Sequence, residues 1–167
     1  MTKEKVRSFL YLFAFLFLVW LCLTISLKSQ ELFAGVLISF ILALLLNELY
    51  VSLDFPPLTI RRITYFIIYI FVLSKEIIKA NFDVAYRVLH PRMPIKPGIV
   101  AIKTGLKSDI AKLFLANSIT LTPGTFTLDI LGDKLLIHWI NVKGKDIDEA
   151  TGIIGKKFEK YLKEIFE

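Results

Sequence analysis

Residues 117–141 read NSITLTPGTFTLDILGDKLLIHWIN, and this stretch carries the strongest strand signals of the chain. Apolar and polar side chains alternate from residue 125 to residue 130, which places Phe126, Leu128 and Ile130 on one face, as in a half-buried strand. The alternation resumes after Gly132–Asp133, a two-residue connection typical of a hairpin with a type I′ or II′ turn. The stretch therefore predicts two antiparallel strands.

A second turn is predicted immediately before this hairpin, at Pro123–Gly124. Proline fixes φ near the value that the first central position of a turn needs, and glycine accepts the positive φ of the second. The pair therefore predicts a type II turn between a helix and the first hairpin strand.

The hairpin belongs to a predicted C-terminal domain at residues 98–167, which follows a proline-rich linker at 91–97. A strand is expected over 99–104, and a short helix over 109–116 after Ser108 as N-cap. Asp146 is expected to cap a final helix after the hairpin. The order β-α-β-β-α predicts a small two-layer α/β domain, in which a right-handed crossover would make the first two strands parallel.

The N-terminal part, residues 1–90, is predicted to be a membrane domain. The whole chain is 55% hydrophobic, and residues 9–27 contain no charge, so a helix there would be about 28 Å long and would cross a bilayer. A second span is predicted at 32–53, interrupted by one carboxylate, Glu48. Two interpretations of Glu48 stay open: an intramembrane ionisable group, or a side chain at the headgroup level.

Residues 60–80 form an amphipathic segment with two interpretations, a third span or a helix lying on the membrane surface. The chain has a formal charge of +6, and basic residues precede the first span and recur from Arg61 onward. Because positive residues favour the cytoplasmic side, we favour two spans, a plasma-membrane protein and a cytoplasmic C-terminal domain. An α-helical membrane hairpin of two spans, with a third as the alternative, would then precede the α/β domain.

Catalytic chemistry is not indicated by any motif in this sequence. Cys22 is the single cysteine, and His90 has no second ligand at a useful spacing, so no metal site, cofactor site or catalytic set is predicted. The positive charge accompanies the apolar half of the chain, which favours membrane lipid as a partner and disfavours nucleic acid.

The block ANSITLTPGTFTLDILGDKLLIHWI at 116–140, together with FEKYL at 158–162, resembles the E subunit of Mrp-type multisubunit sodium/proton antiporters. The same type of subunit occurs in archaeal membrane-bound hydrogenases and related sulfur-reducing complexes. The resemblance implies a non-catalytic integral membrane subunit that assembles and stabilises an ion-translocating complex. Its implied partners are other Mrp-type subunits and, in the second case, hydrogenase-type redox subunits.

Within that resemblance, the turn and its flanks are our candidate contact with neighbouring subunits. The expected interface residues are Asn117, Thr120, Thr122, Pro123, Gly124 and Thr125. Two other hypotheses stay open: Glu48 takes part in ion passage, or the chain is a stand-alone membrane-anchored module that recruits a soluble partner.

Overall fold

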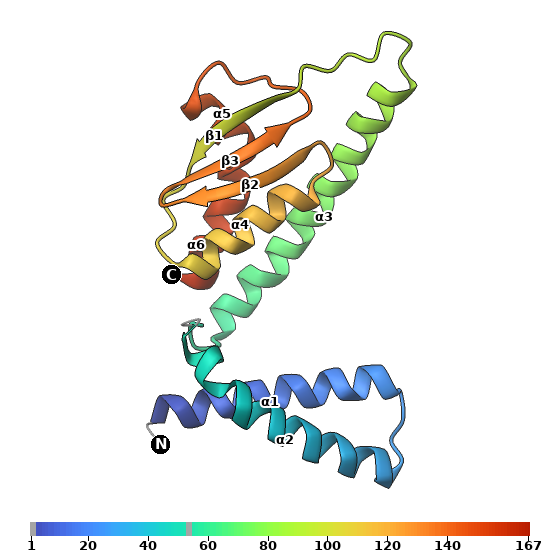
Figure 1. The fold of residues 1–167 in the computed structure, drawn as a ribbon, viewed down its shortest axis with the longest axis vertical. Coiled ribbons are helices and arrows are strands. Elements are labelled where there is room, and N and C mark those ends of the chain that lie inside the picture. The colour runs from blue at the N-terminus through green and yellow to red at the C-terminus, as the bar shows by residue number, and fades with distance from the viewer. Residues whose placement is uncertain (1–2, 53–54) are drawn as a thin grey trace. The chain divides into compact units, whose positions relative to one another are not determined.

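The computed structural model describes residues 3–52 and 55–167 and divides the chain into two compact units, Met1–Phe55 and Pro56–Glu167. The first unit contains α1 (Lys3–Thr24) and α2 (Ser29–Ser52) (Figure 1). The second contains everything from α3 (Ile60–Leu89) to the C-terminus. The sequence placed the boundary later, at 91–97, and the difference arises because α3 contributes to the core of the α/β unit.

The first unit is a helical hairpin, and both of its helices are long and apolar enough to cross a membrane. α1 ends at Thr24, earlier than the predicted end of the span at residue 27, because Ile25 has a φ of +47° that no helix accommodates. α2 begins at Ser29 and ends at Ser52; the predicted end of the second span, Leu53, lies outside the described residues.

Small residues at every fourth position of α2 allow the two helices to pack closely. The buried residues of α2 are Gly35, Ser39, Ala43 and Asn47. A Cβ at Gly35 would lie 2.4 Å from Cδ1 of Trp20, so the indole of α1 packs directly on the α2 backbone. In lipid, helix association depends on this kind of close packing, since the surrounding acyl chains are as apolar as leucine.

The second unit contains a three-stranded sheet with helices on one face. Its further elements are β1 (Gly98–Lys103), α4 (Asp109–Leu121), β2 (Thr125–Leu131), β3 (Lys134–Trp139), α5 (Ile147–Ile154) and α6 (Lys156–Phe166). The strand order is β1-β3-β2, and both outer strands run antiparallel to β3. β1 and β2 therefore run in the same direction, as expected, but β3 lies between them. The predicted α/β class is confirmed, with the final helix split into α5 and α6 at Gly155.

The core of this unit lies between the sheet and its helices. Leu135, Ile137 and Trp139 of β3 are buried on the helical side, in one hydrophobic cluster with Phe158 and Leu162 of α6. Asp146 caps α5 as predicted, accepting a hydrogen bond from the backbone N–H of Glu149 at 2.8 Å. Ser108 occupies the N-cap position of α4, but its side chain makes no capping hydrogen bond.

The predicted facing of β2 is wrong for two of its three apolar residues. Phe126 and Leu128 are 53% and 47% exposed, whereas Thr125 and Thr127 point toward the helices. A β-bulge between Thr127 and Asp129 shifts the register, so that Ile130 alone of the three reaches the core side. The hydroxyls of Thr125 and Thr127 can turn inward because both donate to carbonyls of α4.

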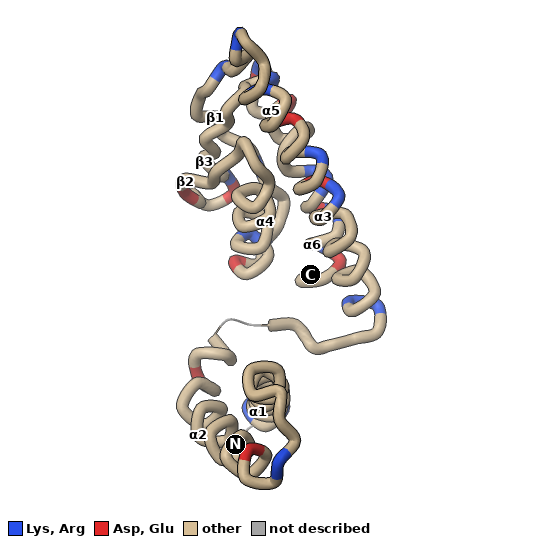
Figure 2. Tube along the Cα trace, turned by 90° about the vertical axis from the view of Figure 1, so that its right-hand side faces the viewer, with Lys and Arg blue, Asp and Glu red and all other residues tan. Residues whose placement is uncertain are grey.

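α3 extends well beyond the predicted segment at 60–80 and ends at Leu89. No proline or glycine occurs between Ile60 and Pro91, so the helix continues until Leu89, two residues before this proline. In the side view of Figure 2 the sheet lies at one edge of this unit and α3 at the other. α3 packs against α6, and Tyr69 joins the core cluster.

Candidate functional site

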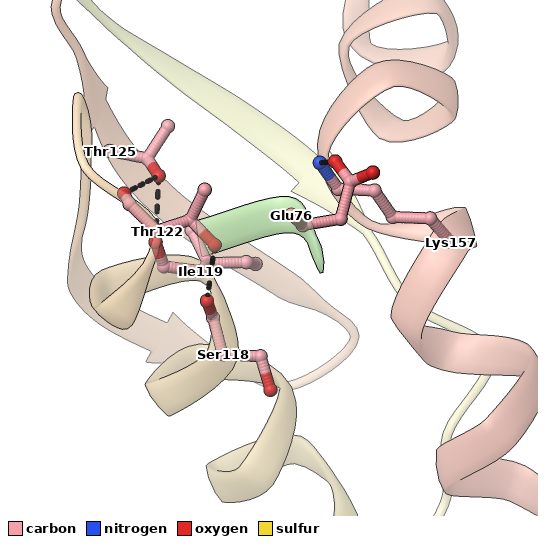
Figure 3. A network of polar contacts seen from close by, with 6 residues as sticks. All are labelled: Glu76, Ser118, Ile119, Thr122, Thr125 and Lys157. Atoms are coloured by element: carbon pink, nitrogen blue, oxygen red, sulfur yellow. Dashed lines mark hydrogen bonds and ion pairs between the residues drawn. The ribbon is translucent and has the colours of Figure 1, made fainter. Parts of the chain in front are cut away.

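The C-terminal end of α4 carries a ladder of hydroxyl groups (Figure 3). Thr122 Oγ1 donates to the carbonyl oxygen of Ser118 at 2.8 Å. Thr125 Oγ1 donates to the carbonyls of Ile119 at 2.6 Å and Thr122 at 2.9 Å. The last carbonyls of a helix have no hydrogen-bond donor within the helix. The hydroxyls of Thr122 and Thr125 supply donors to two of these carbonyls in α4. We expected both hydroxyls to contact a neighbouring subunit, but in the structure they form hydrogen bonds within the unit.

The turn that follows α4 has the predicted type II geometry. The N–H of Thr125 donates to the carbonyl of Thr122 at 3.2 Å, and Gly124 has a φ of +92°. A Cβ at Gly124 would lie 2.9 Å from Cγ2 of Ile140, closer than carbon atoms approach without displacement. Glycine is therefore required here both by backbone conformation and by a close approach, and Pro123 beside it is half-buried.

Two of the six candidate interface residues are exposed on the surface of the unit. Asn117 and Thr120 lie on the outer side of α4, beside a shallow depression that Leu128 and Asp129 also line. Thr120 Oγ1 accepts a hydrogen bond from the N–H of Thr127 at 3.1 Å, which joins α4 to β2. The structure thus separates the set into exposed members on α4 and half-buried or buried members in the turn.

An open cavity of about 300 Å³ lies on the other side of the same turn. Glu76 of α3 and Lys157 of α6 both line it and form an ion pair at 2.6 Å (Figure 3). Burial would raise the pKa of Glu76, but the hydrogen bond and positive charge of Lys157 outweigh it, so this pKa is lowered. The sequence did not predict this pair, because no local pattern links residues 81 positions apart.

Arg87 fixes the end of α3 to the segment that follows it. Its guanidinium donates to both carboxylate oxygens of Asp83, at 2.8 and 3.0 Å, and to the carbonyl of Pro94 at 2.5 Å. With the amide of Asn141 oriented so that its oxygen faces Arg87, this oxygen accepts at 3.0 Å from Nη2. The hydrogen bond and charge of Arg87 lower the pKa of Asp83. The i,i+4 spacing of Asp83 and Arg87 was the signal in the sequence.

Glu48 lies at the end of the helical hairpin that contains the start of α1. Its side chain is 86% exposed within the unit, and Oε1 lies 3.4 Å from Nζ of Lys5. The adjacent Asn47 is buried and donates from Nδ2 to the carbonyl of Lys5 at 3.3 Å. Lys5 belongs to the basic start of the chain, so the structure places Glu48 next to residues expected at a membrane surface.

The open face of the sheet combines exposed apolar side chains with charged and polar ones, which include Lys103, Asp129, Lys134 and His138. Ile99 of β1 and Phe126, Leu128 and Leu131 of β2 are all exposed there. Asp129 pairs with Leu136 across the hairpin, and His138 pairs with Phe126. Exposed apolar clusters of this kind are typical of protein–protein or membrane contacts.

The family model described as Na+/H+ ion antiporter subunit matches residues 13–165 of this chain. The chain belongs to the E-subunit family of Na+/H+ antiporters. It is 36% identical over 130 residues to the E subunit of the Na(+)/H(+) antiporter of Alkalihalophilus pseudofirmus, covering 77% of this chain and 80% of that protein. It is 35% identical over 150 residues to the E1 subunit of the Na(+)/H(+) antiporter of Staphylococcus aureus, covering 89% and 91%.

A solved structure gives a second comparison. A chain of the membrane-bound sulfane sulfur reductase, an archaeal respiratory membrane complex, is 51% identical and superposes with a TM-score of 0.85. The match covers 96% of this chain and 99% of that one. Together with the two apolar helices, these similarities make the chain a membrane protein and confirm the predicted family.

Proposed function

We propose that this chain is an accessory, non-catalytic subunit of a multisubunit cation antiporter-type membrane complex, which it assembles and stabilises. The family match over residues 13–165 carries this proposal. The likeness to the sulfane sulfur reductase chain supports a redox-driven parent complex, because 51% identity over nearly the full length exceeds the 36% to the antiporter subunit of Alkalihalophilus pseudofirmus. A secondary sodium/proton antiporter is the alternative parent.

The proposed topology has two spans, α1 and α2, with both termini and the α/β unit in the cytoplasm. The basic residues Lys3, Lys5 and Arg7 precede the first span, which favours a cytoplasmic N-terminus. Two crossings return the chain to the same side, and α3 belongs to the α/β unit over its whole length. Labelling of single cysteines from either side of sealed vesicles tests this arrangement.

The proposed subunit contact lies on the outer side of α4 and the adjoining part of β2. Asn117 and Thr120 offer exposed polar groups, and Leu128, which lines the same depression, offers exposed apolar area beside them. The turn residues support this surface indirectly, because their hydrogen bonds and turn geometry hold α4 and β2 in position relative to each other. These residues are Thr122, Pro123, Gly124 and Thr125. The partner is a neighbouring Mrp-type subunit, because assembly into one complex is what the family relationship implies.

Glu48 is proposed to be a charge at the membrane surface, paired with Lys5, and not a step in ion passage. A Glu48→Gln variant is then expected to assemble and to support transport at the wild-type rate. Assembly without transport would instead make Glu48 part of the ion path.

The primary test is extraction of the tagged chain from its native membrane in a mild detergent, followed by mass spectrometry of the co-purified proteins. Large antiporter-like subunits together with iron–sulfur or nickel–iron subunits are the expected result. Antiporter-like subunits alone would support the secondary antiporter. Recovery of the chain alone would overturn the proposal and favour a stand-alone anchored module.

The contact surface is tested in the same preparation. Leu128→Lys is expected to reduce the recovery of neighbouring subunits, because it places a charge in the proposed contact. Lys156→Glu, an exposed position at the start of α6, is the matched control for a changed surface charge and should leave recovery unchanged. Equal recovery of both variants would refute this location of the contact.

A further inference from the structure

α3 has two apolar faces, and only one of them is covered within its unit. Tyr69 and Arg87 on the inner face are buried, and Tyr65 and Leu73 pack against the core. Hydrogen bonds fix this face along the whole helix, from Arg61–Glu164 at 2.6 Å near its start to Arg87–Pro94 at its end. A helix that is bound in this way to a polar domain along its full length does not pass through hydrocarbon.

The outer face of α3 is an uncovered apolar stripe that runs the length of the helix. The spacing of the stripe follows the helical period. Its members are Ile60, Ile67, Phe71, Ile78, Phe82 and Leu89. Near the middle of the helix, Phe71 is 71% exposed and Phe82 is 73% exposed. A helix that is apolar on the side opposite its own core has a second apolar partner.

The charges beside this stripe have one sign. Lys75 and Lys79 are exposed on the helix, where Figure 2 shows basic residues recurring along α3. The two acidic residues of α3 pair toward the body of the unit, Glu76 with Lys157 and Asp83 with Arg87. Exposed apolar residues flanked by basic residues fit the headgroup region of an anionic membrane, where each lysine or arginine adds attraction.

Chain connectivity places this helix near a membrane. α2 ends at Ser52 and α3 begins at Ile60. Seven intervening residues reach no farther than about 25 Å even when fully extended. The first turn of α3 therefore lies close to the surface from which α2 emerges.

From these observations we propose that α3 lies in the cytoplasmic surface of the membrane, with its outer stripe in contact with anionic lipid. The inner face of the helix then holds the α/β unit, so α3 docks that unit flat against the bilayer. This inference rests on the proposed two-span topology and goes beyond it, because it assigns a lipid-binding surface outside the spans.

The test uses the full-length chain with Cys22→Ser, reconstituted in vesicles that contain phosphatidylglycerol and lipids brominated at defined acyl positions. A fluorescent label is attached at Phe71→Cys or Phe82→Cys on the stripe. Phe126→Cys, an equally bulky exposed residue on the open sheet face, is the matched control. Leu45→Cys in α2 reports whether the hairpin is inserted.

Both stripe labels are expected to lose most of their emission to bromines near the headgroup, and to an equal extent. The Phe126 label should keep its emission. A third span would instead place the two stripe positions at depths about 16 Å apart, since a helix rises about 1.5 Å per residue. Different depths at the two positions would therefore overturn the proposal.

The remaining outcomes also decide the question. Quenching of the Leu45 label without quenching on the stripe would refute the lipid contact while leaving the two spans intact. No quenching at Leu45 would refute the topology and the inference together. Loss of stripe quenching in the reconstituted whole complex would refute the lipid contact there, because a neighbouring protein would then cover this face. Replacing Lys75 and Lys79 by glutamine should remove the dependence of quenching on phosphatidylglycerol, and unchanged dependence would refute the role of charge.

Discussion

Replacing Gly124 by alanine is expected to destabilise the α/β unit by about 2 to 3 kcal/mol. The backbone at φ +92° costs a side chain about 1 to 2 kcal/mol. The new methyl would also lie 2.9 Å from Cγ2 of Ile140. Because the branched Ile140 side chain has little freedom to rotate away, the overpacking adds about 1 kcal/mol. At about 4 °C per kcal/mol for a unit of this size, the Tm should fall by about 8 to 12 °C.

The assay is thermal unfolding of the purified chain in detergent, followed by the fluorescence of Trp139. A Trp20→Phe background makes this residue the single reporter, because the chain contains two tryptophans. Gly152→Ala is the matched control: it lies in α5 with open space around it, so it should raise stability by about 0.5 to 1 kcal/mol.

Truncating the Ile140 side chain, which removes Cγ2, tests the close contact separately from the backbone. In the Ile140→Ala background, Gly124→Ala should cost about 1 kcal/mol less than in the wild type, because only the conformational cost is left. A fall in Tm of no more than about 2 °C for Gly124→Ala, or strictly additive effects in the double variant, would refute this reasoning.

Three further predictions concern other contacts of the structure. Tyr69→Phe should lower the stability of the unit by about 1 to 2 kcal/mol in denaturant unfolding, because the buried hydroxyl of Ser118 on α4 loses its hydrogen bond to the phenol of Tyr69. The pKa of Glu76 is lower in the folded protein than in the unfolded chain. The ion pair with Lys157 therefore contributes its full stability above the unfolded pKa of about 4.3, and this contribution is lost as the pH falls through the folded pKa. Glu76→Gln lacks this contribution, so its Tm should drop less steeply in acid than the Tm of the wild type. Gly35→Val should separate the hairpin helices, seen as increased protease sensitivity of the chain in vesicles, because the added carbons collide with Trp20.

Turn chemistry explains why so much of the hairpin could be predicted from the sequence. Pro123–Gly124 forms the expected type II turn, and Gly132 with φ +64° joins β2 to β3. Asp133 does not have a positive φ among the described residues, so this second turn is type II′. Each turn depends on one or two residues with unusual backbone freedom, and such residues are visible in a sequence.

The facing of β2 could not be predicted, because it depends on long-range hydrogen bonds. A period of two assigns Phe126 to the same face as Ile130, but one extra residue at the bulge moves them to opposite faces. The hydroxyl of Thr127 donates a hydrogen bond to the carbonyl oxygen of Ala116 on α4 at 3.1 Å, and this bond favours the inward position of the side chain. A hydroxyl that finds a carbonyl after folding carries no signal in the local pattern.

The candidate site shows the same limit. The sequence predicted the residues around the α4–β2 turn as a candidate subunit interface, and it assigned the hydroxyls of Thr122 and Thr125 to a partner. In the structure both serve carbonyls of their own helix, so that only Asn117 and Thr120 are left exposed. Threonine near a helix end has these two uses, and only the position of the neighbouring carbonyls distinguishes them.

The proline-rich segment at 91–97 illustrates a more general point about the components of membrane complexes. Three prolines and a glycine predicted an extended linker, and the structure adds contacts to the unit: Arg87 binds the carbonyl of Pro94, and the N–H of Lys96 donates to the carbonyl of Ile140 at 3.1 Å. The segment is therefore part of the α/β unit, and the short connection at residues 53–59 is what joins that unit to the hairpin. If α3 lies on the bilayer, the membrane and not a linker limits the motion of the unit. The surface formed by α4 and β2 would then be presented to neighbouring subunits at a fixed height, which a freely tethered domain could not do.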